Sequence, residues 1–249
     1  MQLFWLRRST GTSEKGTQYP LAHRRESGYN GERERTAIFL ATEIEMKLGV
    51  PNADILHKVL EDPELTQYMK DDYVTRHMHS SYYDTADGQL NRRKWTLRLR
   101  DEGGQKVAAF KTANMSDDAG FFTRNEWQCL VDNVEDAIPL LIDQGAPREL
   151  KNILKGKPLV ECCGADFDRK SVCLYLDEGV RVEIAGDLGY LFSGEKREPI
   201  CELELELLYG DVGSLPPLCS QLLAEYGLHE ETRSKYQRAR ALGEKNTEE

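Results

Sequence analysis

Several segments of this chain alternate strictly between apolar and charged residues, and this pattern restricts the fold more than any other feature. In the segment 43–48 (EIEMKL) apolar residues stand at every second position, so two glutamates and a lysine share one face of a β-strand. The segment 200–207 (ICELELEL) places three carboxylates on one face in the same way. A single such face would simply meet water, as one face of an antiparallel sheet often does. Several of them need another explanation, because like charges opposite one another destabilise a sheet.

Further charged faces are expected on other strands. They comprise Arg98 and Arg100; Arg124, Glu126 and Gln128; and Arg181, Glu183 and Asp187. If the strands curl into a closed barrel, these faces enclose a lumen and helices cover the apolar outer surface. The pattern therefore predicts an α+β fold: a closed antiparallel eight-stranded β-barrel, or tunnel, with helices packed on the outside.

The expected elements follow from the periodicity of the apolar residues. Strands with a period of two are expected over 42–48, 79–83, 95–100, 107–112, 123–131, 171–176, 181–184, 190–192 and 200–208. Helices are expected over 53–60, 63–70, 135–144, 148–154, 217–226 and 234–242. We assign residues 37–249 to a single domain on this basis. Residues 1–36 lack apolar periodicity, so we expect them to be a disordered N-terminal extension.

The composition excludes several classes of protein. A formal net charge of −10 argues against a nucleic-acid binder, which normally presents a net basic patch. No apolar run approaches the roughly 20 residues that a membrane span needs. The six cysteines have no metal-ligand spacing with the five histidines, so we expect buried free thiols. The sequence predicts a cytoplasmic protein that binds neither nucleic acid nor a membrane, and it does not predict the oligomeric state.

The two signs of charge on the strand faces suit two kinds of ligand. Carboxylate clusters without His or Cys suit hard divalent cations such as Mg²⁺ and Mn²⁺. Rows of Arg and Lys suit phosphate oxygens. A metal-bound polyphosphate combines both chemistries, so we expect a small-molecule substrate of this class. A glycine-rich P-loop is missing from the sequence, so phosphate binding of that kind is not expected.

An ordered set of short motifs extends over residues 42–242. It consists of Glu43-x-Glu45-x-Lys47, Tyr82-Tyr83-Asp84-Thr85, Leu97-Arg98-Leu99-Arg100, Phe110-Lys111-Thr112, Arg124-x-Glu126, Val182-Glu183-Ile184-Ala185, Glu198–Leu207 and Ser234-Lys235. With this set the chain resembles the CYTH superfamily, also called triphosphate tunnel metalloenzymes. The stretch Glu198–Leu207 is especially similar to bacterial inorganic triphosphatases. We expect none of the helical CHAD domain that often follows in those enzymes within these 249 residues.

The resemblance implies roles for individual residues. The implied ligands of Mg²⁺ or Mn²⁺ are Glu43, Glu45, Glu202 and Glu204. The basic residues implied to bind the triphosphate are Lys47, Arg98, Arg100, Lys111, Arg124 and Lys235, with Arg169 as a further basic strand position. Glu126 is implied to orient Arg124 or a metal-bound water. The expected catalytic residues are therefore Glu126, Lys47 and Arg124.

Two positions depart from the family pattern. Gln128 stands where the commoner motif has a second carboxylate, which leaves the role of that position open. Asp187 follows a glycine where a larger apolar residue is usual, so we expect a reshaped strand end there.

The activity implied by the resemblance is that of an inorganic triphosphatase, which hydrolyses inorganic triphosphate (tripolyphosphate) to pyrophosphate and phosphate with a metal ion. Thiamine-triphosphatase, nucleoside-triphosphatase and class IV-type adenylate cyclase activities on the same tunnel are alternatives. A non-catalytic polyphosphate-binding module is a further alternative, which the complete set of implied metal ligands disfavours. Because the carboxylates would repel one another inside a lumen, we also expect the metal-free protein to be strained.

Overall fold

The computed structural model describes residues 38–112, 115–116, 122–176 and 179–244 of the chain. Within these ranges a ten-stranded antiparallel sheet is combined with helices, so the predicted α+β class is confirmed. The extension predicted for residues 1–36 lies outside the described residues. None of the described helices is long and apolar enough to cross a membrane.

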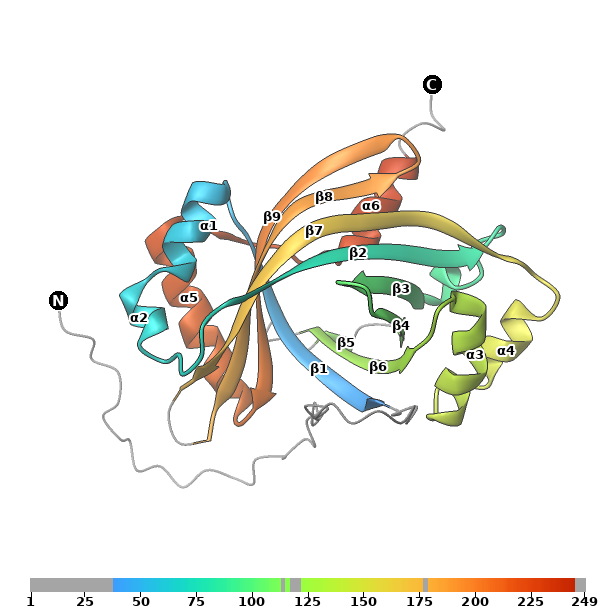
Figure 1. The fold of residues 1–249 in the computed structure, drawn as a ribbon, viewed down its shortest axis with the longest axis horizontal. Helices are drawn as coiled ribbons and strands as arrows, with labels where there is room; N and C mark the ends of the chain where they lie inside the picture. The colour runs from blue at the N-terminus through green and yellow to red at the C-terminus, as the bar shows by residue number, and fades with distance from the viewer. Residues whose placement is uncertain (1–37, 113–114, 117–121, 177–178, 245–249) are drawn as a thin grey trace.

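The strands form one strongly curved sheet (Figure 1). They are β1 (Ile38–Gly49), β2 (Val74–Thr85), β3 (Thr96–Glu102), β4 (Lys106–Lys111), β5 (Met115–Ser116), β6 (Phe122–Leu130), β7 (Leu159–Tyr175), β8 (Arg181–Ser193), β9 (Lys196–Tyr209) and β10 (His229–Glu230). Their order in the sheet is β10-β1-β9-β8-β7-β2-β3-β4-β6-β5.

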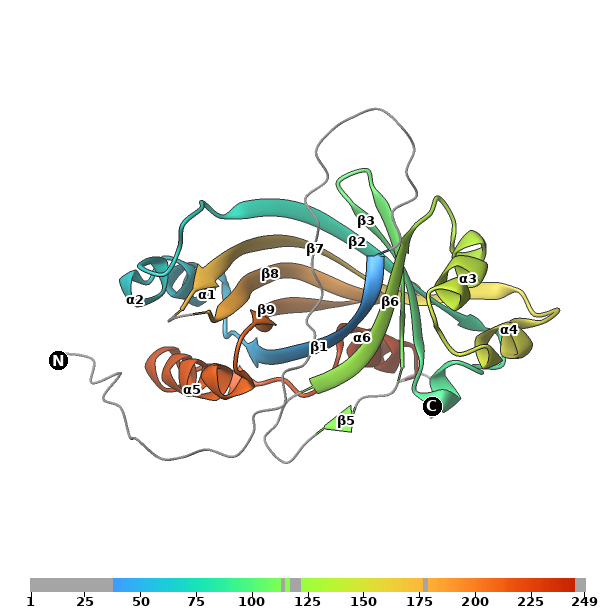
Figure 2. The same cartoon turned by 90° about the horizontal axis from the view of Figure 1, so that it is seen from below.

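Strand β1 pairs with two strands that are far apart in this order. Its C-terminal half pairs with β9, where Lys47 lies opposite Glu204. Its N-terminal half pairs with β6, where Glu43 lies opposite Arg124. Figure 2 shows β1 and β6 side by side. Strand β1 therefore connects both ends of the run from β9 to β6.

The helices are short and lie between or after the strands. They are α1 (Ala53–Leu60), α2 (Pro63–Thr66), α3 (Val134–Asp143), α4 (Glu149–Leu154), α5 (Leu215–Tyr226) and α6 (Lys235–Glu244), with 3-10 turns at Asn91–Arg93 and Val212–Ser214. Local capping determines several of their ends. The side chain of Asn52 accepts a hydrogen bond from the Ile55 amide at the start of α1. Gly227, with a φ of 63°, ends α5 in the left-handed region that favours glycine.

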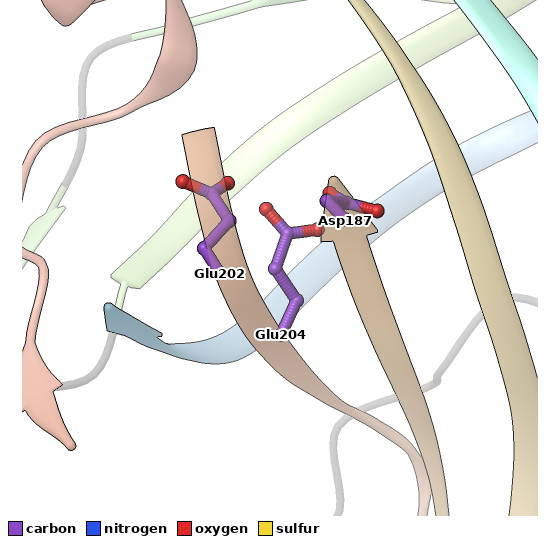
Figure 3. A group of neighbouring side chains, drawn as sticks. All are labelled: Asp187, Glu202 and Glu204. Atoms are coloured by element: carbon purple, nitrogen blue, oxygen red, sulfur yellow. The ribbon is translucent and has the colours of Figure 1, made fainter. Parts of the chain in front are cut away.

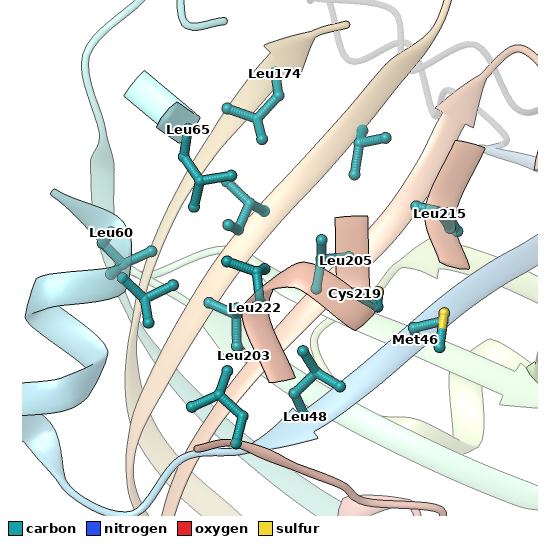
Figure 4. Close-up of a cluster of buried hydrophobic side chains, with 14 of the residues drawn as sticks. Met46, Leu48, Leu60, Leu65, Leu174, Leu203, Leu205, Leu215, Cys219 and Leu222 are labelled. Carbon is teal, nitrogen blue, oxygen red and sulfur yellow. The ribbon is translucent and has the colours of Figure 1, made fainter. Parts of the chain in front are cut away.

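Two apolar clusters cover the outer surface of the sheet. Helices α1, α2 and α5 pack on β1, β7, β8 and β9 at one end, at the left of Figure 1. Figure 4 shows this cluster, in which Leu48 and Leu203 of the strands meet Leu60 and Leu222 of the helices. Helices α3 and α4 cover β3, β4 and β6 at the other end around the buried Phe110. The prediction that helices pack on the apolar outer surface is confirmed for these five helices.

Helix α6 is different, and the prediction is wrong for it. Its residues Tyr236, Ala239 and Leu242 form a third cluster with side chains such as Phe167 of β7 and Ile200 of β9. Because side chains alternate along a strand, Ile200 shares its face with the Glu202 carboxylate. Helix α6 therefore packs on the charged, inner face of the sheet. Its charged residues can satisfy the polar groups there, which an apolar outer helix could not do.

Among the strand boundaries that differ from the predictions, those of β7 and β8 bear on the site. The segments predicted as 181–184 and 190–192 belong to the single strand β8, which includes the predicted break at Asp187. Strand β7 begins at Leu159, well before the predicted residue 171. Gly186 explains the first difference: a Cβ atom there would lie 2.9 Å from Leu60 Cδ1. The glycine allows α1 to pack closely on a continuous strand, so the expectation of a reshaped strand end is wrong.

Candidate functional site

Many of the charged residues on the strand faces are buried. No more than 9% of the surface is exposed at Glu45, Lys47, Arg98, Arg100, Glu126, Asp187, Glu202 and Lys235. Charged residues are almost never this buried unless they are paired or hold a ligand. This excludes the reading in which each charged face is simply the wet side of an open sheet.

Three carboxylates converge on this inner face. Asp187 of β8 lies directly opposite Glu202 of β9, and Glu204 follows two residues later on β9. Ligand oxygens of the three groups all lie within 4.8 Å of one another, and Figure 3 shows the side chains turned toward a common point. We call Asp187, Glu202 and Glu204 the acidic set. Oxygen ligands of this kind fit a hard divalent cation.

Lys235 and Arg169 provide the positive charge beside the acidic set. The Lys235 ammonium donates to Asp187 Oδ2 at 2.6 Å and to Glu204 Oε1 at 2.9 Å. It also contacts Glu202. The Arg169 guanidinium donates to both oxygens of Asp187, at 2.7 and 2.6 Å, and contacts Glu204. Every carboxylate of the acidic set therefore has a cationic partner.

Two further cations extend this network. The Nζ atom of Lys47 lies 3.5 Å from Glu204 Oε1 and 3.8 Å from Glu45 Oε1. Arg238 in α6 donates to Glu202 Oε2 at 2.6 Å. The network thus joins β1, β7, β8, β9 and α6, which are distant in the sequence.

The contacts shift the pKa values of the residues involved. Burial opposes ionisation of the Glu204 carboxyl, but Lys235, Arg169 and Lys47 outweigh it and hold the pKa well below its usual range. Burial likewise opposes the charge of Lys235, but the three carboxylates raise the pKa of its ammonium well above the usual range. Each carboxylate of the metal-free acidic set therefore has a compensating cation, which the expectation of a strained protein did not include. Strand periodicity cannot place Lys235, because it lies in a helix.

A second buried group is dominated by positive charge. We call Arg98, Arg100 and Lys111 the basic set. The Nζ atom of Lys111 lies 2.9 Å from Glu126 Oε2, and Arg98 Nη2 lies 3.8 Å from Glu126 Oε1. Arg100 Nε donates to the Ser80 hydroxyl at 3.0 Å. The Nε of Arg98 is buried and has no hydrogen-bond partner among the described residues.

The cations of the basic set repel one another, although Glu126 pairs with Lys111 and Arg98 and Glu102 lies 3.5 Å from Arg100. Burial, together with the nearby charges of Arg98 and Arg169, lowers the pKa of the Arg100 guanidinium to about 10. Arg169 thus contacts Asp187 and Glu204 of the acidic set, and its charge also affects Arg100 of the basic set. An anion bound beside Arg98 and Arg100 would relieve this repulsion and could accept from the unpartnered Arg98 Nε.

The family model described as the CYTH domain matches residues 41–239, which is most of the chain. The chain belongs to the CYTH domain family. The resemblance inferred from its motifs is thereby confirmed.

Relatives of this CYTH domain were found among curated proteins and among solved structures. The inorganic triphosphatase of Haemophilus influenzae (strain Rd) is 28% identical over 208 residues, which cover 82% of this chain and 55% of that protein. The chain thus spans about half the length of this curated relative. The structure of HpAC1 from Hippeastrum is described as an adenylyl cyclase candidate with a dominant triphosphatase activity. It is similar with a TM-score of 0.54 and 18% identity, over 80% of this chain and 95% of that one. That similarity concerns the fold.

The structure assembles most of the residues that the sequence selected for the CYTH site. Glu202, Glu204, Lys235 and Arg169 meet in the acidic set and its partners. The remaining predicted residues with described side chains lie beside them on the same inner face: Glu45, Lys47, Arg98, Arg100, Lys111 and Glu126. The side chains of Glu43 and Arg124 lie outside the described part, although their backbones pair between β1 and β6.

Two residues of the candidate site, Asp187 and Arg238, are not among those that the sequence predicts. The sequence places Asp187 on a charged strand face, but the family resemblance does not imply it as a metal ligand. Asp187 shares a strand face with Arg181 and Glu183, and this alternation is the sequence feature that could have identified it. Arg238 gave no such signal, because its partner Glu202 is distant in sequence and the helical pattern of α6 does not show which face meets the sheet.

Proposed function

We propose that this CYTH domain hydrolyses inorganic triphosphate to pyrophosphate and phosphate with the help of a divalent metal ion. The observation that carries the proposal is the burial of an acidic set and a basic set on one face of the sheet, connected by Arg169. Buried charges of both signs are costly unless a ligand or a partner compensates them. The relative named inorganic triphosphatase supports a phosphoanhydride substrate.

The proposal includes a closed tunnel. The pairing of β1 with both β9 and β6 supports it, because β1 would join the two ends of the seven-strand run from β9 to β6 into a ring of eight strands. We infer that residues 37–249 form the single catalytic domain. Closure would keep bulk water from the charges, which strengthens their interaction with a triphosphate.

The acidic set fits Mg²⁺ or Mn²⁺, because it offers carboxylate oxygens without thiolate or imidazole ligands. Asp187, Glu202 and Glu204 would hold the ion, with Glu45 and Glu43 contributing from β1 as the family resemblance implies. When bound, such an ion polarises phosphate oxygens and favours attack by water.

The basic residues would bind and orient the triphosphate. Arg98, Arg100 and Lys111 would bind the phosphate groups away from the metal, while Lys47, Arg169 and Lys235 would bind those near it. Lys47 and Arg124 would neutralise the charge that moves to the leaving oxygen. Glu126 contacts Lys111 and Arg98, so it would position these two cations.

A panel of triphosphates tests the proposal. Release of phosphate from tripolyphosphate, thiamine triphosphate and ATP is measured with Mg²⁺ and with Mn²⁺, and cyclic AMP is measured in parallel. We expect tripolyphosphate to be hydrolysed fastest. Faster hydrolysis of ATP or formation of cyclic AMP would instead support a nucleotide-directed enzyme. Absence of turnover together with tight tripolyphosphate binding would indicate a binding module.

Variants test whether the inner face is the site. Arg98→Gln should lower the turnover of tripolyphosphate roughly a hundredfold, because it removes a buried donor to developing negative charge. Arg197→Gln is the matched control, since Arg197 lies over the rings of Tyr190 and Phe192 and donates to loop carbonyls. Equal activity of the two variants would contradict the placement of the site.

A further inference from the structure

Two adjacent cysteines lie in β7 at an irregularity of the sheet. Cys163 pairs with Tyr82 of β2, but the next pair along is Glu161 with Tyr83, so Cys162 is an extra residue in a β-bulge. Neighbouring residues of a regular strand point to opposite faces. The bulge instead brings the two Sγ atoms within 3.8 Å of each other.

The surroundings of the two thiols are unequal. Cys163 is buried, whereas Cys162 is half-buried and its thiol donates a hydrogen bond to the Tyr82 carbonyl oxygen at 3.2 Å. The contact between the two thiols and the nearby Arg240 guanidinium lower the pKa of the Cys162 thiol, although burial and the Asp84 carboxylate oppose them. The same contact between the thiols and burial raise the pKa of Cys163.

The other described thiols serve as comparisons. Cys173 and Cys201 are half-buried like Cys162, but burial raises the pKa of both. Burial also raises the pKa of Cys129 to about 11 and that of Cys219 to about 12. Partial exposure alone therefore does not distinguish Cys162, and the adjacent thiol and guanidinium do.

We propose that Cys162 is a redox modification site, which forms a mixed disulfide with low-molecular-weight disulfides of the glutathione type. The Cys162 thiolate attacks one sulfur of the disulfide, so that a new S–S bond forms as the old one breaks. The second sulfur leaves as a thiolate and takes a proton from water. The cysteine is oxidised, the small disulfide is reduced, and Cys163 donates its hydrogen bond to the attacking thiolate.

The position of Cys162 gives the modification a structural consequence. Cys162 packs against the cluster that contains Tyr236, Ala239 and Leu242 of α6. A tripeptide attached at Cys162 would have to displace part of this helix. Since α6 begins with Lys235, which contacts the whole acidic set, displacement would also weaken those contacts. A loss of activity on modification additionally depends on the proposed function, whereas the reactivity does not.

Mass spectrometry of the full chain tests the reactivity without any substrate. With oxidised glutathione we expect a single adduct at Cys162, formed about tenfold faster than at Cys173 or Cys201 because of its larger thiolate fraction. The rate at Cys162 should reach its plateau at lower pH than the rates at the other two. Cys163→Ala should slow the reaction, whereas Cys163→Ser, which keeps a hydrogen-bond donor, should slow it less. Equal rates at the three thiols, or no effect of Cys163→Ala, would overturn the proposal.

A melting experiment tests the link to α6. The purified adduct should melt several degrees lower than the reduced protein, and a dithiol reductant should restore the original Tm. Cys162→Ser treated with oxidised glutathione is the control and should show no shift. An adduct at Cys162 that leaves the Tm unchanged would refute the displacement of α6.

Discussion

Replacement of Lys235 by methionine is the most informative change for the candidate site. The Lys235 ammonium is 6% exposed and contacts the carboxylates of Asp187, Glu202 and Glu204. Removing one partner of a buried ion network leaves uncompensated charge and costs about 3–5 kcal/mol. Because Arg169 and Arg238 remain beside the carboxylates, we expect the lower end, about 3 kcal/mol. For a chain of this size this corresponds to a decrease of about 6–12 °C in Tm.

The loss of stability in Lys235→Met should depend on the metal ion, and this dependence is the decisive measurement. A divalent cation binds the folded acidic set only, so at a hundredfold excess over its Kd it adds about 2.7 kcal/mol of stability. Lys235→Met removes the cation that competes for the same oxygens, so Mg²⁺ should raise the Tm of the variant more than that of the wild type. Scanning calorimetry in EDTA and in Mg²⁺ measures both effects.

The loss of stability caused by Lys235→Met should also depend on pH. The pKa of Glu204 is held below its usual range, so the stability that it contributes is present above that range and is lost as the pH falls through the lowered pKa. The difference between Lys235→Met and the wild type should therefore shrink on acidification. Lys157→Met is the control for an exposed pair, because Lys157 contacts Asp87 at 2.8 Å with both side chains at least 40% exposed. It should cost less than about 1 kcal/mol. A Lys235→Met variant as stable as the wild type in EDTA, with the same response to Mg²⁺, would refute the reasoning.

Three further predictions concern the fold and its surface. Leu203→Ala should lower the unfolding free energy by about 2–5 kcal/mol in urea titrations, because Leu203 is fully buried under α5 and α1; a cost below 1 kcal/mol would contradict that packing. Gly189→Ala should destabilise the protein by more than about 1 kcal/mol, since the new Cβ would lie 2.3 Å from the backbone oxygen of Asp166; an unchanged Tm would show that β7 and β8 are less close. The hydrogen bond to Asp168 raises the pKa of His77, so the contribution of His77 to stability is present below its usual range and is lost as the pH rises through the raised pKa. NMR titration should show a lower His77 pKa in Asp168→Asn.

The period-two alternation predicted the sheet well because burial of the charged face and burial of the apolar face enforce the same register. The apolar residues Leu203 and Leu205 meet the outer helices, and Glu202 and Glu204 between them face inward, as the pattern indicates. The helices were predicted because their apolar spacing and caps are local features.

Features that depend on contacts between distant residues were not predictable in this way. The first twelve of the seventeen residues of β7 were missed, and the bulge at Cys162 interrupts the alternation near the start of this part. The inner position of α6 was missed because a helical pattern shows that one face is apolar but not which surface it covers. The compensation of the acidic set by Lys235 follows from that position, so it was missed for the same reason.

The double pairing of β1 has a consequence for how the chain folds. Met46 of β1 pairs with Leu205 of β9, so the first described strand cannot complete its hydrogen bonds until most of the chain has been synthesised. Contacts between residues so distant in sequence slow folding. During that interval β1 presents an unpaired edge, which is the kind of surface that aggregates. The charges at every second position of its EIEMKL segment would then protect the nascent chain from self-association before they serve any ligand.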